Sequence, residues 1–191
     1  MSAYDLSKDK LFLDKAVELA DRLIPAFHEN SSMPHTEVNL RTGAFRNSEW
    51  HKTTSILSEV GSIQLEFKYL SHVTGDMKYW DIAQNIMQVL DKQKKRHSGL
   101  YSVYISTSEG TIMGDHITLG ALGDSFYEYL LKQWLLTGEE QFHRMYREFI
   151  QGLKDKLIAK STPNNFVYIR EMKGGRPMAK FDHLVCFAVG I

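Results

Sequence analysis

The sequence has little cysteine, no excess of either charge and no long apolar run. One cysteine, Cys186, stands among 191 residues, so no disulfide can form within the chain. Lys plus Arg number 23 and Asp plus Glu number 23, which leaves no net field to attract nucleic acid or an anionic membrane. No run of about 18 apolar residues is present to span a bilayer. The opening MSAYDLSKDK lacks the apolar core of a signal peptide. We therefore expect no nucleic acid partner, no membrane span and no targeting segment.

Signatures of several enzyme classes are missing as well. The chain has no zinc-ligand spacing, P-loop, GxGxxG or GxSxG motif, so hydride transfer, phosphoryl transfer and serine hydrolysis have no support. What is present is a 43% apolar share with 10 Phe, 9 Tyr and 3 Trp, which is typical of a packed globular domain. Asn30-Ser31-Ser32 matches an N-glycosylation acceptor, although so short a pattern often arises by chance.

Hydrophobic periodicity predicts solvated and buried helices in alternation, with two β-hairpins between them. Solvated helices are expected at 7–27, 77–92 and 139–160, and helices apolar on most faces at 53–74 and 118–137. Residues 28–52 are expected to form a long loop. Hairpins are expected around 107–110 and at Gly174 and Gly175. FDHLVCFAVGI then begins another apolar element, in which Cys186 is either a buried small hydrophobe or half of a disulfide.

This order of elements predicts an all-α fold with short β-hairpins. Inner helices that pack on outer helices and also face a lumen are typical of an α/α barrel or toroid. Because the pattern stops inside an apolar run at Ile191, we expect residues 1–191 to form one partial barrel domain without its N-terminal and C-terminal parts.

Four carboxylates interrupt the apolar faces of the two most apolar predicted helices. At about 100° per residue, Glu59 and Glu66 share one stripe of the first helix. Asp124 and Glu128 share one stripe of the second, with Leu122 on its other side. A carboxylate removed from water must be paired, metal-bound or protonated, so these acids predict a polar lumen. Paired carboxylates suit glycoside hydrolysis and their oxygens suit Ca²⁺, whereas the alternative is pairing with loop amides, Arg or Lys.

His183 lies beside Asp182 in FDHLVCF, among apolar residues. This position resembles that of a buried functional histidine, although a core histidine bonded to a backbone carbonyl is somewhat more common.

Six long stretches of the chain carry a family pattern: DRLIPAF, PHTEVNLRTG, LSEVGSIQLEFKYLSHVTGDMKYW, LGALGDSFYEYLLKQWLLTG, FVYIREMKGG and FDHLVCFAVG. In this order they resemble the class I α-1,2-mannosidases of glycoside hydrolase family 47. The resemblance implies a barrel of seven helical hairpins and inverting hydrolysis of terminal α-1,2-linked mannose from high-mannose N-glycans. It also implies a Ca²⁺ cofactor, a Golgi or endoplasmic reticulum lumenal location, and a parent protein that is membrane-anchored although this chain is not.

The resemblance also implies roles for single residues. Asp124 matches one of the family's three central catalytic carboxylates, while Glu59 and His183 match sugar-contacting positions. Glu66 and Glu128 remain substrate-binding candidates on helical spacing alone.

Further family positions concern Cys186 and Leu122. Cys186 matches one half of the family's disulfide, and its partner is expected beyond Ile191. Endoplasmic reticulum members tend to carry Arg two residues before the catalytic aspartate, where this chain has Leu122, so the resemblance favours the Golgi type.

Essential parts of the family site have no counterpart in this sequence. The acid motif is expected before residue 1, and the base motif and the threonine that ligates Ca²⁺ are expected after residue 191. We therefore expect no metal ligand in this chain and no activity from it alone. The alternatives are a lectin-like member that directs misfolded glycoproteins to degradation, or a non-catalytic isoform that binds glycan or a partner protein.

Overall fold

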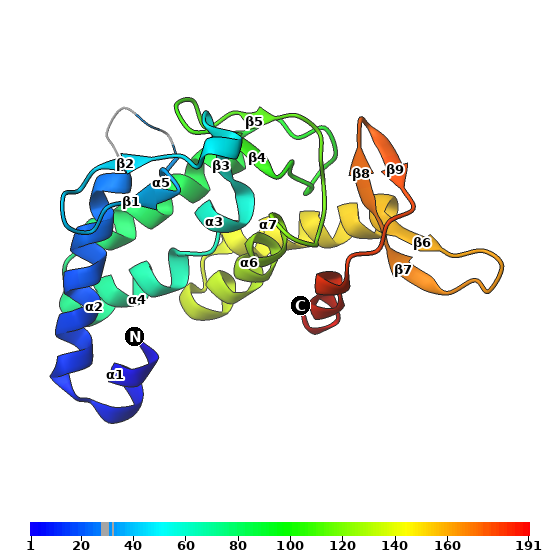
Figure 1. The fold of residues 1–191 in the computed structure, drawn as a ribbon. Helices are drawn as coiled ribbons and strands as arrows, with labels where there is room; N and C mark the ends of the chain where they lie inside the picture. The colour runs from blue at the N-terminus through cyan, green and yellow to red at the C-terminus, as the bar shows by residue number, and fades with distance from the viewer. Residues whose placement is uncertain (28–30, 32) are drawn as a thin grey trace.

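The computed structural model describes residues 1–27, 31 and 33–191 (Figure 1). Its α-helices are α1 Ser2–Ser7, α2 Lys10–Leu23, α3 Leu57–Val60, α4 Gln64–Thr74, α5 Lys78–Lys92, α6 Asp124–Thr137 and α7 Glu140–Gly152. Short helical turns are η1 Ile24–Ala26, η2 Glu49–His51, the π-helix η3 Leu153–Leu157, and η4 His183–Gly190. The predicted glycosylation acceptor depends on Asn30 and Ser32, which lie outside the described residues.

Short antiparallel strands connect the helices. The strands are β1 Glu37–Val38, β2 Phe45–Arg46, β3 Thr54–Ile56, β4 Tyr104–Ser106, β5 Ile112–Met113, β6 Ile158–Lys160, β7 Val167–Ile169, β8 Glu171–Lys173 and β9 Arg176–Met178. They pair as β1–β2, β3–β4–β5, β6–β7 and β8–β9. Figure 1 shows α1 and α2 at one end of the molecule and the β6–β7 and β8–β9 hairpins at the other. The predicted all-α class with short hairpins is confirmed.

The prediction of a single helix over residues 53–74 is wrong for the first half of this range. Thr54–Ile56 is instead the strand β3, which pairs with β4 and is favoured by its β-branched residues. The following helix is broken between α3 and α4 at Gly61, where a Cβ would lie 2.3 Å from the Phe126 ring. Because α3 and α4 are separate helices, the helical spacing that related Glu59 to Glu66 does not run through this segment.

Three other predicted helices have ends that differ from the prediction. Helix α6 begins at Asp124 rather than at 118, because Ile117 pairs with Met172 and Leu122 adopts a left-handed conformation with φ 79°. Helix α7 passes into η3 and then into β6, so residues 158–160 form a strand. The helix predicted from residue 7 begins at Lys10, where the Asp9 carboxylate accepts a hydrogen bond from the Leu11 amide at 2.9 Å.

Both predicted hairpins are confirmed. The 107–110 turn joins β4 to β5, and β3 adds a third strand. Gly174 and Gly175 join β8 to β9 with φ of 63° and 70°, a conformation that glycine adopts without steric cost. The β6–β7 hairpin was not predicted.

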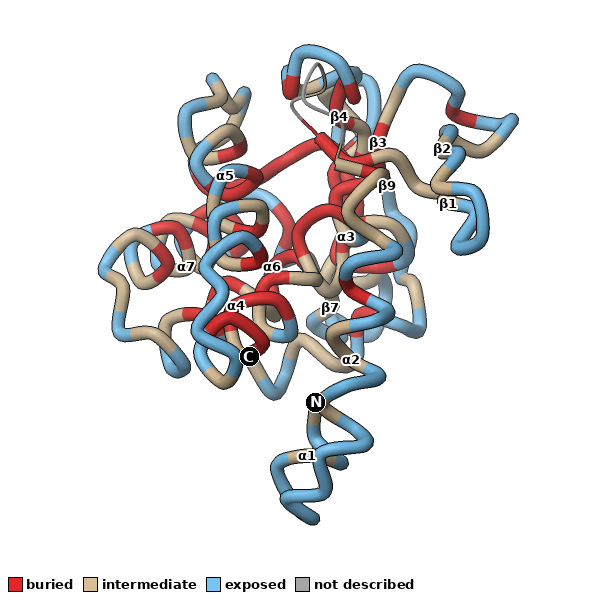
Figure 2. The backbone as a smooth tube through the Cα atoms, turned by 90° about the vertical axis from the view of Figure 1, so that its left-hand side faces the viewer, coloured by how far each residue is buried: buried red, intermediate tan, exposed pale blue. Residues whose placement is uncertain are grey.

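The main core lies where α5, α6 and α7 meet the segments after residues 100 and 117. Aromatic side chains fill it, with the Tyr127 and Phe149 rings stacked 4.3 Å apart. Figure 2 shows buried backbone concentrated in the central helices and exposed backbone in α1. In α2 only Ala20 is buried, Leu13, Ala16 and Val17 pack partly buried against a second, smaller core cluster, and Leu11, Phe12 and Leu19 are exposed.

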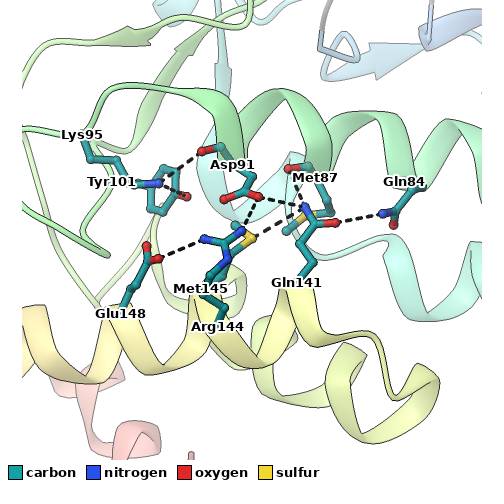
Figure 3. A network of polar contacts seen from close by, with 9 residues as sticks. All are labelled: Gln84, Met87, Asp91, Lys95, Tyr101, Gln141, Arg144, Met145 and Glu148. Carbon is teal, nitrogen blue, oxygen red and sulfur yellow. Dashed lines mark hydrogen bonds and ion pairs between the residues drawn. The ribbon is translucent and has the colours of Figure 1, made fainter.

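A polar network joins the two outer helices α5 and α7 above this core (Figure 3). Arg144 of α7 pairs with Asp91 of α5 and donates to Glu148 at 2.9 Å. Gln141 accepts a hydrogen bond from Gln84 at 3.0 Å. These contacts hold the faces of α5 and α7 in register. Among the described residues, no helix is both long and apolar enough to cross a membrane.

Candidate functional site

Asp124 is the first residue of α6 and is half-buried. Its carboxylate accepts a hydrogen bond from the Ser125 amide at 2.9 Å. The Ser58 amide donates to the Leu122 carbonyl at 3.0 Å, and the Ser125 hydroxyl donates to the Ser58 carbonyl at 3.4 Å. Because these bonds join the starts of α3 and α6, Asp124 and Glu59 lie on neighbouring helical turns.

Glu59 belongs to α3 and faces a cavity of about 260 Å³. The cavity walls include Phe27, His35, Ile63 and Phe67. Although Glu59 is exposed, the surrounding protein removes part of its water, and this desolvation raises the pKa of its carboxyl against the opposing field of His51. Glu59 is therefore open to solvent, and its carboxyl keeps its proton to a higher pH than usual. These two properties suit a side chain that contacts a polar ligand.

Glu66 and Glu128 occupy the α4 and α6 helices. Glu66 is exposed and accepts hydrogen bonds from the Tyr129 hydroxyl at 3.0 and 3.3 Å. Burial, together with the Glu66 charge, raises the pKa of Tyr129 to about 12, so this hydroxyl remains a donor at neutral pH. Glu128 is half-buried and pairs with Lys132 one turn further along α6. Both predicted candidates therefore already have a partner on α6: Tyr129 for Glu66, and Lys132 for Glu128.

The expectation that all four acids are removed from water is wrong for this chain. Glu59 and Glu66 are exposed, and Asp124 and Glu128 are half-buried. The buried side chains of α4 and α6, such as Phe67 and Leu130, point to the core instead. The acids lie on the faces of these helices that the described residues leave partly open.

His183 begins η4, and its side chain is 89% exposed. The prediction of a buried histidine, whether functional or structural, is therefore wrong here. Its Nδ1 lies 3.5 Å from Asp182, whose carboxylate also caps η4 by accepting from the Leu184 amide at 3.0 Å. Cys186 on the same turn is exposed, so the alternative of a buried small hydrophobe is also wrong.

Sequence reasoning missed two buried charged side chains. Lys68 is fully enclosed between the Trp80 and Phe142 rings and pairs with Glu139 at 3.0 Å. Glu171 is 4% exposed and receives three side-chain donors. The sequence offers two signals for them: Lys68 stands between apolar positions of a helix, and Glu171 stands among β-forming residues. Neither pattern identifies the residues that pair with these charges.

The described residues do not form a calcium site by themselves. They contain no group of three or more His, Cys, Asp or Glu side chains that could hold a metal ion. Since Ca²⁺ prefers six to eight oxygen ligands, the described residues alone do not fit this cofactor.

Comparisons with known proteins decide the family. The family described as Glycosyl hydrolase family 47 matches residues 1–191. The chain belongs to glycosyl hydrolase family 47. An α-1,2-mannosidase from Trichoderma reesei superposes with a TM-score of 0.84 at 28% identity, covering 93% of this chain and 37% of the enzyme. The helices described above are thus part of the family 47 α/α barrel.

Curated family 47 relatives match over the entire chain. A mannosyl-oligosaccharide 1,2-alpha-mannosidase of Candida albicans is 40% identical, and an endoplasmic reticulum mannosyl-oligosaccharide 1,2-alpha-mannosidase of Homo sapiens is 41% identical. Mannosyl-oligosaccharide alpha-1,2-mannosidase IA of Spodoptera frugiperda is 43% identical. The chain covers 34%, 28% and 29% of these three proteins, so it spans about a third of their length.

Proposed function

We propose that this chain contributes to the inverting hydrolysis of terminal α-1,2-linked mannose on high-mannose N-glycans. The observation that carries the proposal is the placement of Asp124 and Glu59 on adjoining helical turns, in a chain that matches family 47 throughout. Inverting glycosidases use a carboxylic acid to protonate the leaving oxygen and a carboxylate to activate water. This chain supplies a carboxylate and sugar contacts, and the completed site requires further carboxylates.

Within this proposal Asp124 is the catalytic carboxylate, held by the amide of Ser125 in a fixed position at the start of α6. Glu59 and His183 contact the sugar, and their exposure leaves both free to do so. Glu66 and Glu128 are second candidates for sugar contact, which would compete with Tyr129 and Lys132.

The cofactor and location are proposals as well. Family 47 enzymes are calcium-dependent, and we propose that Ca²⁺ binds in the completed domain through ligands other than the residues of this chain. We propose that the parent protein is membrane-anchored and lies in the lumen of the Golgi or endoplasmic reticulum; of these two locations, the endoplasmic reticulum stands in the names of several relatives. Leu122 supports the Golgi type, and a disulfide from Cys186 to a cysteine outside this chain fits its exposure.

The test uses a domain of full family length that contains residues 1–191, either from full-length cDNA or completed with the flanking segments of a relative. We call it the completed domain. It should release mannose from a Man-α-1,2-Man disaccharide, and Asp124→Asn should lower kcat by about a hundredfold or more, because removal of one member of a catalytic constellation costs orders of magnitude.

Asp14→Asn, an exposed carboxylate on α2, is the matched control and should leave kcat unchanged. Binding of the disaccharide without release, measured by calorimetry, would instead favour a lectin-like member. Release that survives Asp124→Asn would remove the catalytic role of this residue.

A further inference from the structure

Glu171, at the start of β8, is a buried carboxylate that joins two separate segments. Its Oε1 accepts hydrogen bonds from the Thr118 hydroxyl at 3.1 Å and from the Lys180 ammonium at 2.8 Å. Its Oε2 lies 3.2 Å from Nε2 of His116. Burial raises the pKa of Glu171, but the hydrogen bonds from Lys180, His116 and Thr118 outweigh burial and hold that pKa below its usual range. At neutral pH the Glu171 carboxylate is therefore charged, and both of its oxygens have hydrogen-bond partners.

One path of hydrogen bonds leads from Glu171 to Asp124. The Thr118 hydroxyl that donates to Glu171 also accepts from the Gly120 amide at 2.8 Å. The Gly120 carbonyl accepts from the Asp124 amide at 3.1 Å. Paired backbone bonds between Ile117 and Met172, both 2.9 Å, hold β8 beside this loop. The start of α6 is therefore held against β8 through the 117–124 loop.

A second path leads from Glu171 to His183. Lys180 also lies 4.0 Å from the carboxylate of Asp182, the residue that caps η4 immediately before His183. Asp182 packs so closely on Gly120 that a Cβ there would lie 2.8 Å from its Cβ and Cγ. The two paths thus meet again at Gly120, which closes a ring of contacts around Glu171.

We propose that Glu171 is a positioning residue that fixes Asp124 and His183 relative to each other. The functional part of this inference rests on the proposed roles of those two side chains, whereas the geometric part does not. Glutamine fills the same space but replaces one acceptor oxygen with an NH₂ donor. Glu171→Gln also replaces the charged acceptor with a neutral amide, so the bonds from Thr118 and Lys180 lose their charge assistance and both paths weaken, whichever way the NH₂ faces.

Hydrogen exchange on the completed domain tests the geometric part. In Glu171→Gln, amides in 116–124 and 180–184 should exchange at least about tenfold faster, because loss of a buried charge-assisted bond makes local opening easier. Amides of α4 and α5 should be unchanged. Glu140→Gln, whose side chain is 81% exposed, is the matched control. Equal exchange in Glu171→Gln and Glu140→Gln would overturn the inference.

Kinetics of two single-path variants test the functional part. Thr118→Val keeps the shape but cuts the path to Asp124, so it should lower kcat by about tenfold with little change in KM. Lys180→Met cuts the path to His183 and should mainly raise KM, also by about tenfold. The same kcat and KM pattern in both variants, or no change in either, would show that Glu171 only supports the fold.

Failure of the proposed function remains distinguishable from failure of this inference. If the completed wild-type domain releases no mannose, the proposed function fails, and the exchange comparison still decides whether Glu171 holds the two segments. If Glu171→Gln does not fold, Thr118→Val supplies the exchange test at residues 116–124.

Discussion

At the scale of single residues, Leu122 has two distinct consequences for the chain. Its φ of 79° costs a non-glycine residue about 1 kcal/mol or more. Its carbonyl accepts from the Ser58 amide at 3.0 Å, so this left-handed turn ties the start of α3 to the start of α6. The half-buried side chain is apolar and offers no hydrogen bond to a sugar hydroxyl beside Asp124.

Leu122→Arg in the completed domain should therefore change the order in which mannose branches are cut. An arginine donates up to five hydrogen bonds in a fixed fork, and each charge-assisted contact is worth about 1.5–3 kcal/mol, or roughly tenfold or more in branch ratio. Wild type should accept several branches of a nine-mannose glycan, whereas the variant should slow on some of them. Chromatography of the isomers measures this order.

Leu122→Met is the control for that experiment, because it keeps the apolar character and the same Cβ in the left-handed turn. The Golgi-type assignment is wrong if wild type stops at a single eight-mannose isomer. It is equally wrong if Leu122→Arg and Leu122→Met give the same branch order.

Glu171 also predicts how stability depends on pH. Its pKa is lowered in the folded chain, so its contribution is fully present above its unfolded pKa of about 4.3 and is lost as pH falls through the lower folded value. Lys180 and His116 face it, and Asp182 lies behind Lys180. The Tm difference between wild type and Glu171→Gln should be constant near pH 6 and shrink below about pH 4.3. A difference that grows on acidification would contradict the lowered pKa.

At the scale of elements, α3 and α6 are tightly packed against each other at the candidate site, where Gly61 approaches the Phe126 ring. A Cβ on Gly61 would lie 2.3 Å from the Phe126 ring and 2.9 Å from the Leu57 carbonyl. Phe126 is fully buried and packs edge-on against Tyr101 and Tyr127, so its ring has little room to move.

Gly61→Ala should therefore destabilise the completed domain by about 1–3 kcal/mol, the usual cost of an overpacked core. It should also lower kcat, since α3 and α6 carry Glu59 and Asp124. Gly190→Ala, where no atom lies within 4 Å, is the control. Denaturant unfolding measures the difference, and an unchanged free energy of unfolding for Gly61→Ala would show that α3 can shift away freely.

At the scale of the whole molecule, the described residues leave large apolar side chains in water. Leu135 and Leu136 on α6 are 69% and 49% exposed, and Val189 on η4 is 93% exposed. Leu11 and Phe12 on α2 are also exposed. Exposed apolar groups of this kind indicate surfaces that other parts of a barrel cover.

The 191-residue chain expressed by itself should consequently fold poorly. We expect a broad thermal transition, binding of a hydrophobic dye, and no release of mannose from the disaccharide. The completed domain is the control and should show a sharp transition with little dye binding. A sharp cooperative transition from monomeric 191-residue chain would contradict this prediction, as would mannose release that Asp124→Asn abolishes.

The family, the class of fold and the positions of most helices follow from the order of the residues alone. Long motifs such as LGALGDSFYEYLLKQWLLTG are specific, and the 77–92 periodicity matches α5 closely because local spacing is enough to define an amphipathic helix. The turn at Gly174 and Gly175 follows from local chemistry in the same way.

The breaks between helices and the partners of the buried charges depend on contacts that exist only in the folded chain. Thr54–Ile56 became a strand because β4, some 50 residues away, offers backbone partners. α6 begins at Asp124 because Ile117 pairs with Met172, and His183 is exposed because η4 packs on the core through Val185 and, in part, Ala188. Glu171 acquires its role from His116, Thr118 and Lys180, and no sequence period reports contacts between segments that are brought together only by folding.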